Sequence, residues 1–336
     1  MDSDSAGAET AAGSPVHRIE FDVDWPPGSV AAYLVDGPEP TLVDAGMSPD
    51  GAGEEALLAG LAAADLAPAD VEHVLLTHPH VDHLGVVALL QEAGDPTVYA
   101  PATSRETFVR PFEDLRTEMA PAVRAAGVPT AMVETAMTRA LDSYRRVRDS
   151  LAVEWVDEWV AAGTTFDVGG HAVTAVATPG HQQDHLCYRT TVDAPGGPEA
   201  ALFSGDMGIA TFRAPVLQAP FLPAQREGMA AYHEANDRLA AMDVDRVYPG
   251  HGPVHEDLPG AVALARESLE RLCDRTDALL RDADRPSHAL AIAQERTDDV
   301  TDGTWIPETV AALAHLEREG RAESTVEDGV RLYVPV

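Results

Sequence analysis

The chain has 336 residues, 45% of them hydrophobic, which is enough for one large domain with an appendage or for two domains. Its 56 acidic residues outnumber the 23 basic ones, all of them arginines, and give a formal net charge of −33 spread along the whole chain. This charge argues against sequence-independent binding to nucleic acid or to an anionic membrane, because both need basic side chains.

The acidic surface suits an environment in which salt screens charge repulsion. We therefore expect a cytoplasmic protein of a salt-accumulating organism, with an ordinary acidic protein from a GC-rich source as the alternative. The two cysteines, Cys187 and Cys273, are too few for a disulfide framework and too far apart for a redox motif, so we expect buried or inert thiols. We expect no membrane-spanning segment, and we expect residues 1–14 to form a disordered acidic tail rather than a signal peptide.

Short β-rich runs separated by turns occupy residues 15–100. The runs AAYLVDG (31–37) and TLVDAG (41–46) predict a hairpin that turns at Gly37 and Pro38. The following runs predict a helix, a strand, a helix closed by Gly94 and another strand, in the order EEALLAGLAAA, VEHVLL, LGVVALLQEAG and DPTVYAP.

Residues 102–162 change character. Apolar residues recur at helical spacing from Phe108 to Tyr144, and Trp155 and Trp159 follow one turn apart. We expect three or four helices that interrupt the strand pattern. This insertion either packs against the body of the protein or forms a lid over a site, and its methionine and aromatic content suits both roles.

Strands return after the insertion, and a mainly helical tail follows. The runs HAVTAVATPGH, LCYRTTV and AALFSGD predict strands, followed by the helix MAAYHEANDRLAAM and the strand DRVYPGHG. A long amphipathic helix follows Leu258, then two shorter helices and a hairpin that turns at Asp328 and Gly329. This order predicts a small winged-helix-like domain over residues 259–336, after a main domain over residues 15–258.

Polar, titratable residues gather where four of the predicted strands end. The run THPHVDHLG places His78, His80, Asp82 and His83 after one strand, and single residues follow three others, namely His181, Asp206 and His251. Loops at strand ends converge while the sheet holds them rigid, so we expect these side chains to meet. The remaining histidines near these motifs lie off the pattern, and we expect His185 to orient a loop.

Seven ligands exceed the four of one tetrahedral zinc ion but suit two ions. Residues two apart in an extended loop face the same side, so His78 and His80 can hold one ion, while Asp82 and His83 face a second. A histidine from elsewhere completes each triad, and one carboxylate can bridge the pair. Two ions roughly 3.5–4 Å apart can hold a bridging hydroxide that attacks an electrophile.

The motif HPHVDH with the later TPGH, FSGD and YPGHG resembles the metallo-β-lactamase superfamily of αββα hydrolases, over about residues 16–253. The resemblance implies a four-layer αββα sandwich, with the helical insertion and the tail as additions. It also implies that His78, His80 and His181 hold one metal ion, that Asp82, His83 and His251 hold the other, and that Asp206 bridges them. Asp44 matches a buried aspartate that braces the metal loop, and the tail is similar to the winged-helix extension of lactamase-like endoribonucleases and glyoxalase II relatives.

Differences from neighbouring families narrow the chemistry. The commonest zinc β-lactamases place cysteine where this chain has Asp206, which argues against β-lactams as the main substrate. Flavo-diiron oxygen reductases carry glutamate in place of the second histidine, so His80 favours two zinc ions over iron, with manganese as a further alternative. Glyoxalase II enzymes grip glutathione with basic and tyrosine side chains, and a chain without lysine offers only arginine there.

We therefore expect a dinuclear zinc hydrolase of a small ester, thioester or lactone, with Asp82 or Asp206 receiving the proton during turnover. The first alternative is phosphodiester cleavage of RNA, which the tail's resemblance suggests but its acidic charge disfavours. The second is a non-enzymatic winged-helix regulator that reads DNA. We expect the tail to pack near the cleft or to form a homodimer.

Overall fold

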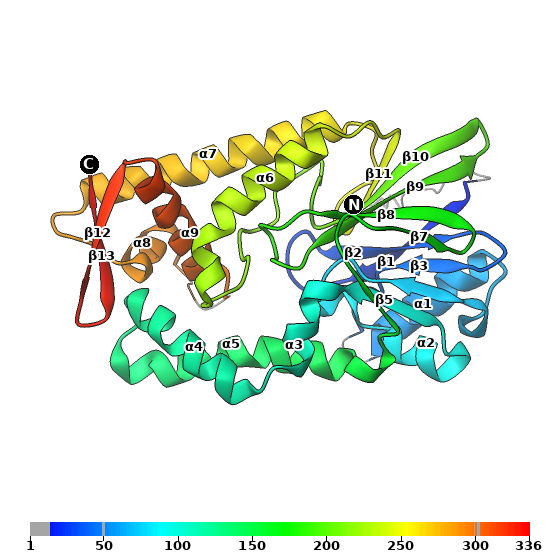
Figure 1. The fold of residues 1–336 in the computed structure, drawn as a ribbon, viewed down its shortest axis with the longest axis horizontal. Helices are drawn as coiled ribbons and strands as arrows, with labels where there is room; N and C mark the ends of the chain where they lie inside the picture. Colours follow the sequence, from blue (N-terminus) through cyan, green and yellow to red (C-terminus); the bar gives the residue numbers. More distant parts are fainter. Residues whose placement is uncertain (1–13, 49–50, 299, 301–302) are drawn as a thin grey trace, which may run out of the picture.

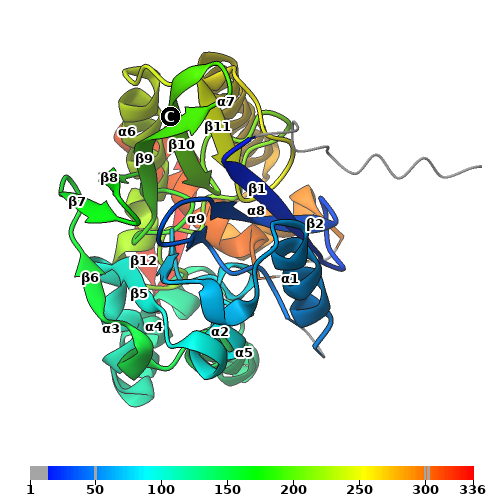
Figure 2. The same cartoon turned by 90° about the vertical axis from the view of Figure 1, so that its right-hand side faces the viewer.

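The computed structural model describes residues 14–48, 51–298, 300 and 303–336, so the expected tail at residues 1–14 lies outside the described residues except for Ser14. Two β-sheets pack face to face (Figures 1 and 2). The first sheet has six strands in sequence order, β1 (Val16–Asp22), β2 (Ser29–Val35), β3 (Thr41–Val43), β4 (His73–Leu75), β5 (Thr97–Pro101) and β6 (Glu158–Val160). The second has five strands in the order β11 (Arg246–Pro249), β10 (Gly197–Gly205), β9 (Leu186–Ala194), β8 (His171–Ala177) and β7 (Thr165–Val168).

Alternation along the strands explains why both faces of each sheet are buried. In β2, Ala31, Tyr33 and Val35 belong to the cluster between the sheets. The intervening Val30, Ala32 and Leu34 face the opposite way and pack with α1 (Ala52–Ala63) and α2 (Val87–Gly94). The outer face of the second sheet is covered by α6 (Gly228–Ala240) and α7 (Leu258–Asp282). This is the expected four-layer αββα sandwich.

The insertion consists of α3 (Arg105–Val109), α4 (Phe112–Ala125) and α5 (Thr130–Ser150), which run along one long side of the molecule (Figure 1). Leu115, Met119 and Met137 belong to a small hydrophobic cluster that also includes Phe221 and Leu222 from outside the insertion. The predicted helical pairing of Trp155 with Trp159 is wrong, because Trp159 lies in β6 and pairs with Ala100 of β5. Both tryptophans pack on the face of the first sheet that α1 and α2 cover. Their spacing therefore reflects burial on this face rather than one turn of a helix.

The tail comprises α7, then α8 (Ala289–Arg296), α9 (Trp305–Arg318) and the hairpin β12 (Ala322–Glu327) and β13 (Val330–Pro335). The hairpin turns at Asp328 and Gly329, whose φ angles of 49° and 83° are those of a tight two-residue turn. Helix, helix and hairpin thus follow the predicted order, while the winged-helix assignment itself stays a prediction. The tail shares one hydrophobic cluster with α6 and the second sheet, so it is packed onto the main domain.

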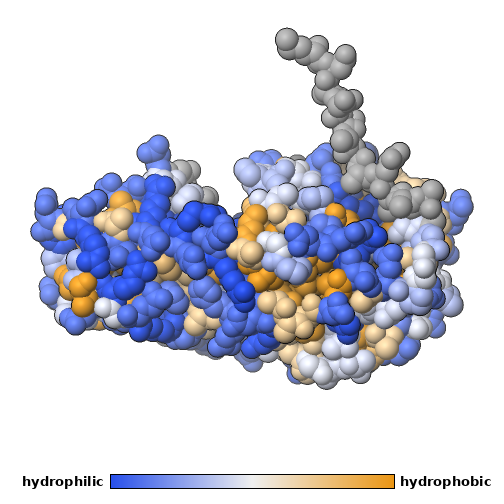
Figure 3. All heavy atoms as spheres, turned by 90° about the horizontal axis from the view of Figure 1, so that it is seen from above, coloured by the Kyte–Doolittle hydropathy of each residue, from blue (hydrophilic) through white to orange (hydrophobic). Residues whose placement is uncertain are grey.

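Hydrophilic and hydrophobic side chains are distributed unevenly over the surface. Figure 3 shows one face on which hydrophilic side chains dominate at the tail end and hydrophobic ones gather over the sandwich. Across the residues that the structure describes, no helix has the length and apolarity needed to cross a membrane.

Candidate metal centre

Four loops at one edge of the sandwich bring the seven predicted residues together. The loop after β4 carries His78, His80, Asp82 and His83, and the loop after β8 carries His181. Strands β10 and β11 run parallel, with Phe203 opposite Tyr248, so the residues that follow them emerge at the same edge. Asp206 and His251 therefore meet the histidine loop from the second sheet.

The first group of side chains comprises His78, His80, His181 and Asp206, whose potential ligand atoms all lie within 4.8 Å of one another. Nδ1 of His80 lies 3.0 Å from Nε2 of His78 and 3.0 Å from Nε2 of His181. Oδ2 of Asp206 lies 3.2 Å from Nε2 of His181. His78 is fully buried, whereas His80 is partly exposed and forms the accessible side of the group.

The second group comprises Asp82, His83 and His251, again within 4.8 Å. Nε2 of His251 lies 3.4 Å from Oδ2 of Asp82 and 3.5 Å from Oδ1 of Asp206. Oδ1 of Asp206 also lies 3.3 Å from Nε2 of His83. The two carboxylate oxygens of Asp206 thus face different groups, Oδ2 the first and Oδ1 the second.

Two atoms of this cluster fit a bound cation better than a protein hydrogen bond. Nε2 of His83 and Oδ1 of Asp206 are buried and have no hydrogen-bond partner among the described residues. Buried polar atoms without partners are costly, and these two atoms lie 3.3 Å apart in the same small space. Imidazole nitrogens and carboxylate oxygens are the donor set that suits zinc.

The imidazole nitrogens that point away from the cluster have hydrogen-bond partners as well. Nδ1 of His83 donates to Oδ2 of Asp44 at 2.8 Å, which leaves the Nε2 lone pair of His83 for the cluster. The same Asp44 carboxylate accepts from the backbone N–H of Thr77 at 2.8 Å and from its hydroxyl at 2.9 Å. The Thr77 oxygen lies 3.0 Å from Nδ1 of His78. Asp44 therefore holds together the two ends of the histidine loop, at Thr77 and at His83.

Backbone carbonyls hold the other two histidines. Nδ1 of His181 donates to the carbonyl of Pro215 at 2.9 Å, and Nδ1 of His251 donates to the carbonyl of Ser29 at 2.8 Å. Neither contact can be predicted from the sequence, because any residue can supply a backbone carbonyl.

His185 lies beside the cluster without belonging to it. Its Nε2 accepts the backbone N–H of Asp206 at 3.0 Å, and its Nδ1 lies 2.7 Å from the hydroxyl of Thr178. It thus orients the loop that carries Asp206, in agreement with the expectation that it positions a loop.

Glycines before the candidate ligands serve two different purposes. Gly205 has φ +49°, a left-handed conformation, whereas Gly250 does not have a positive φ. A Cβ at Gly250 would lie 2.7 Å from Cε1 of His83 and 2.9 Å from Oδ1 of Asp206. Close approach, rather than a sharp turn alone, requires glycine at position 250.

The electrostatics favour cation binding. Burial and the nearby His181 lower the pKa of His80 to about 3, so its ring stays neutral at pH 7. Burial alone would raise the pKa of Asp206, but His251 and His83 hold it well below its usual range. Burial would likewise lower the pKa of His83, and the Asp44 and Asp206 carboxylates raise it instead. A divalent cation can replace the proton that such carboxylates draw onto a histidine.

A cavity of about 480 Å³ opens beside His80, within the size range of small-molecule sites. Its walls come from three distant parts of the chain, namely α5 of the insertion, the loop at residues 217–221 and the start of α9 in the tail. Many lining side chains are apolar, among them Met132, Ala136, Leu217, Phe221 and Ile306. The insertion and the tail thus complete the site, while movement of the insertion as a lid stays a prediction.

The sequence profile of the metallo-beta-lactamase superfamily matches residues 25–251. The chain therefore belongs to this superfamily and is a metal-dependent hydrolase. The probable metallo-hydrolase YqjP of Bacillus subtilis (strain 168) is 25% identical over 289 residues, which cover 80% of each protein. The lactamase-like protein vrtG of Penicillium aethiopicum is 37% identical over 102 residues, which cover 30% of this chain and 28% of vrtG.

Solved structures show the same fold. The metallo-beta-lactamase family protein TTHA1429 from Thermus thermophilus superposes with a TM-score of 0.71 at 23% identity, covering 96% of this chain and 99% of its own. BJP-1, a subclass B3 metallo-beta-lactamase of Bradyrhizobium japonicum, gives a TM-score of 0.52 at 17% identity and covers 80% of this chain and 94% of its own. The fold of TTHA1429 thus extends over parts of this chain that have no counterpart in BJP-1.

Proposed function

We propose that the cluster holds two divalent metal ions, with zinc as the ion that its ligands favour. His78, His80 and His181 would hold one ion, Asp82, His83 and His251 the other, and Asp206 would contribute one carboxylate oxygen to each. The placement of Oδ1 and Oδ2 of Asp206 toward different groups, at 3.3 Å and 3.2 Å from His83 and His181, is the observation that carries this proposal.

Bound divalent ions supply Lewis acidity and lower the pKa of a water toward neutrality. The protein residues do the rest. Asp44, Pro215 and Ser29 fix the histidine rings through their far nitrogens. The carboxylates of Asp82 and Asp206 are the groups placed to take up the proton that an attacking water loses. His78 and His83 are fully buried, whereas His80 is partly exposed. The substrate would therefore reach the cluster from the side of His80.

We infer that the substrate is a small ester, thioester or lactone. The cavity beside His80 has room for one small molecule, and apolar side chains of α5, the loop at 217–221 and α9 suit an acyl chain. Phosphodiester cleavage of RNA is the weaker alternative, because the chain carries a net charge of −33.

The structure gives a reason against the regulator alternative. A DNA-recognition helix needs an exposed face, and α9, the helix before the hairpin, would have to fill this role. Most of its residues are buried, including Ala311, Leu313 and Leu316, and the others are only partly exposed apart from its last residue, Arg318. We propose that the tail acts as a wall of the substrate cavity, and a homodimer through it stays a prediction.

The test is a substrate panel for the zinc-loaded protein, with a thioester, an ester, a lactone, a phosphodiester and RNA. We expect hydrolysis of the carboxylic substrates, and activity on RNA alone would favour the alternative. Asp206→Ala should abolish activity and lower bound zinc below that of the wild type. Asp206→Asn keeps the volume of the side chain and removes its negative charge, so it separates the effect of the charge from that of the lost volume. His171→Gln, at the opposite end of β8 from His181, is the control that should change neither. Full activity with two zinc ions in Asp206→Ala would refute the bridging role.

A further inference from the structure

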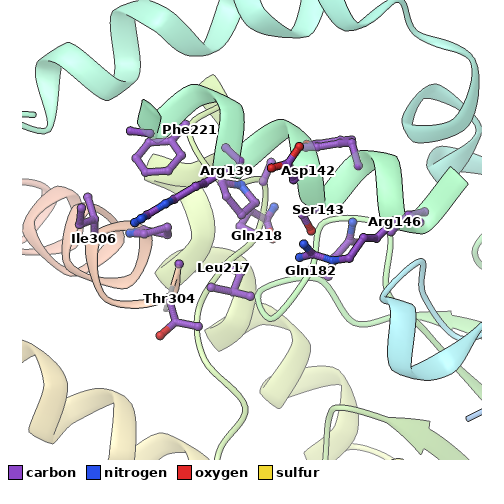
Figure 4. A pocket seen from close by; sticks show the side chains of 18 of the residues that line it. Arg139, Asp142, Ser143, Arg146, Gln182, Leu217, Gln218, Phe221, Thr304 and Ile306 are labelled. Carbon is purple, nitrogen blue, oxygen red and sulfur yellow. The ribbon is translucent and has the colours of Figure 1, made fainter. Parts of the chain in front are cut away.

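Two arginines of the insertion, Arg139 and Arg146, line the cavity beside the metal centre. They lie seven residues apart on α5, so they share one face of the helix about 10 Å apart along its axis. Figure 4 shows Arg139 extending toward Phe221 and Ile306, and Arg146 lying beside Gln182. Gln182 follows the candidate ligand His181, so Arg146 marks the metal side of the cavity.

Neither arginine has a carboxylate or other side-chain partner within the described part of the chain, unlike their neighbours on α5. Arg145 pairs with Asp142, and Arg148 donates to the backbone carbonyls of Thr107 and Arg110. Both side chains are exposed, so their guanidinium groups are free to meet a molecule that enters the cavity. Two guanidinium groups left unpaired in one cavity therefore point to a ligand that supplies the negative charge.

The rest of the lining decides what kind of ligand this is. Asp142 is the acidic residue among the lining side chains, and it is engaged by Arg145. Apolar residues such as Val128, Met132 and Leu217 supply most of the remaining wall. An apolar wall with two unpaired arginines matches an amphiphilic molecule, with a hydrocarbon part and an anionic group.

We propose that Arg139 and Arg146 bind an anionic group, carboxylate or phosphate, at some distance from the scissile bond of the substrate. This inference rests on the proposed hydrolase function and narrows it, because the substrate becomes an ester or thioester with a negatively charged end. The arginines are specificity-determining residues here, since they select the substrate without reaching the bond that breaks.

The first experiment measures binding to the full-length, metal-free protein at one fixed KCl concentration, so that it does not depend on catalysis. The probes are octanoate, octyl phosphate and octanol, which share one chain and differ in the head group. We expect the wild type to bind at least one anionic probe roughly tenfold more tightly than octanol. The ratio between octanoate and octyl phosphate separates carboxylate from phosphate.

The variants are Arg139→Gln, Arg146→Gln and the double variant, and Arg124→Gln on α4 is the matched control. Arg124 is exposed, has no side-chain partner among the described residues and does not line the cavity. We expect the double variant to lose roughly tenfold or more in affinity for the anionic probe and to bind octanol as the wild type does. The single variants show which arginine contributes more.

The second experiment uses the zinc-loaded enzyme with two thioesters that differ only in a terminal carboxylate. The double variant should raise KM for the charged thioester and leave kcat and the neutral thioester unchanged. Equal binding of octanol and both anionic probes by the wild type, or unchanged affinity in the double variant, would overturn the proposal. Absence of hydrolysis with anion binding intact would instead count against the proposed function alone.

Discussion

Asp44 offers a sharp test of how the histidine loop is held. Its side chain is 3% exposed and accepts hydrogen bonds from His83, from the Thr77 backbone and from the Thr77 hydroxyl. Its φ of 58° also lies in the left-handed region, where aspartate and asparagine are tolerated better than alanine. Replacing Asp44 with alanine therefore removes three interactions and adds backbone strain.

The magnitude follows from these contacts. Each buried donor left without a partner costs about 1–3 kcal/mol, and the left-handed alanine adds about 1 kcal/mol. We expect Asp44→Ala to lower the free energy of unfolding by about 4 kcal/mol, allowing for partial relaxation. Asp44→Asn keeps the backbone conformation and one acceptor oxygen, so we expect about half that loss.

The assay is urea unfolding of the metal-free protein, followed by circular dichroism at fixed KCl. Asp65→Ala is the matched control, because Asp65 has the same φ of 58° but an exposed side chain. It should lose only the backbone part, about 1 kcal/mol. Metal affinity of Asp44→Ala should also fall roughly 10- to 100-fold. Equal unfolding midpoints for the wild type and Asp44→Ala would show that Asp44 does not stabilise the histidine loop.

Three further predictions concern stability and reactivity. Glu308 accepts from Arg213 and Arg296 at 2.8 Å each, and although burial would raise its pKa, these arginines lower it. Its contribution to stability is thus present above the unfolded pKa and is lost as pH falls through the lower folded pKa. Glu308→Gln should cost about 3 kcal/mol at pH 7 and progressively less in acid, and a pH-independent difference would contradict the pairing. The urea midpoint should rise between 0.1 M and 3 M KCl, since the Debye length falls from about 10 Å at 0.1 M to about 3 Å at 1 M, and equal stability would remove the proposed adaptation to salt. Burial raises the pKa of Cys187 and Cys273 to about 12, so both thiols should resist iodoacetamide at pH 8 until urea is added, and rapid labelling of the native protein would show that they are accessible.

Local pattern was sufficient for most of the architecture. The helices α1, α2, α6 and α7 follow from apolar periodicity, and the last hairpin follows from Asp328 and Gly329, which tolerate positive φ. The convergence of the seven candidate residues follows from their positions after strands, because strand ends share one edge of the sandwich.

Other features depend on contacts that no local pattern reveals. The carbonyls of Ser29 and Pro215 hold two histidines, and any residue could supply a carbonyl. The short strand β7 was not predicted. Trp159 suggested a helix because it follows Trp155 by four residues, but Trp155 precedes β6 and Trp159 lies within it. The cavity beside His80 is lined by both α5 and α9, so it forms only after the tail has packed beside the insertion.

We propose that residues far apart in the sequence hold two metal ions around Asp206. The most direct measurement is anomalous diffraction at the zinc edge from crystals of the zinc-loaded protein. We predict two peaks roughly 3.5–4 Å apart, one within bonding distance of His78, His80 and His181 and the other of Asp82, His83 and His251. A single peak, or two peaks that leave Asp206 unligated, would rule out a dinuclear centre bridged by Asp206.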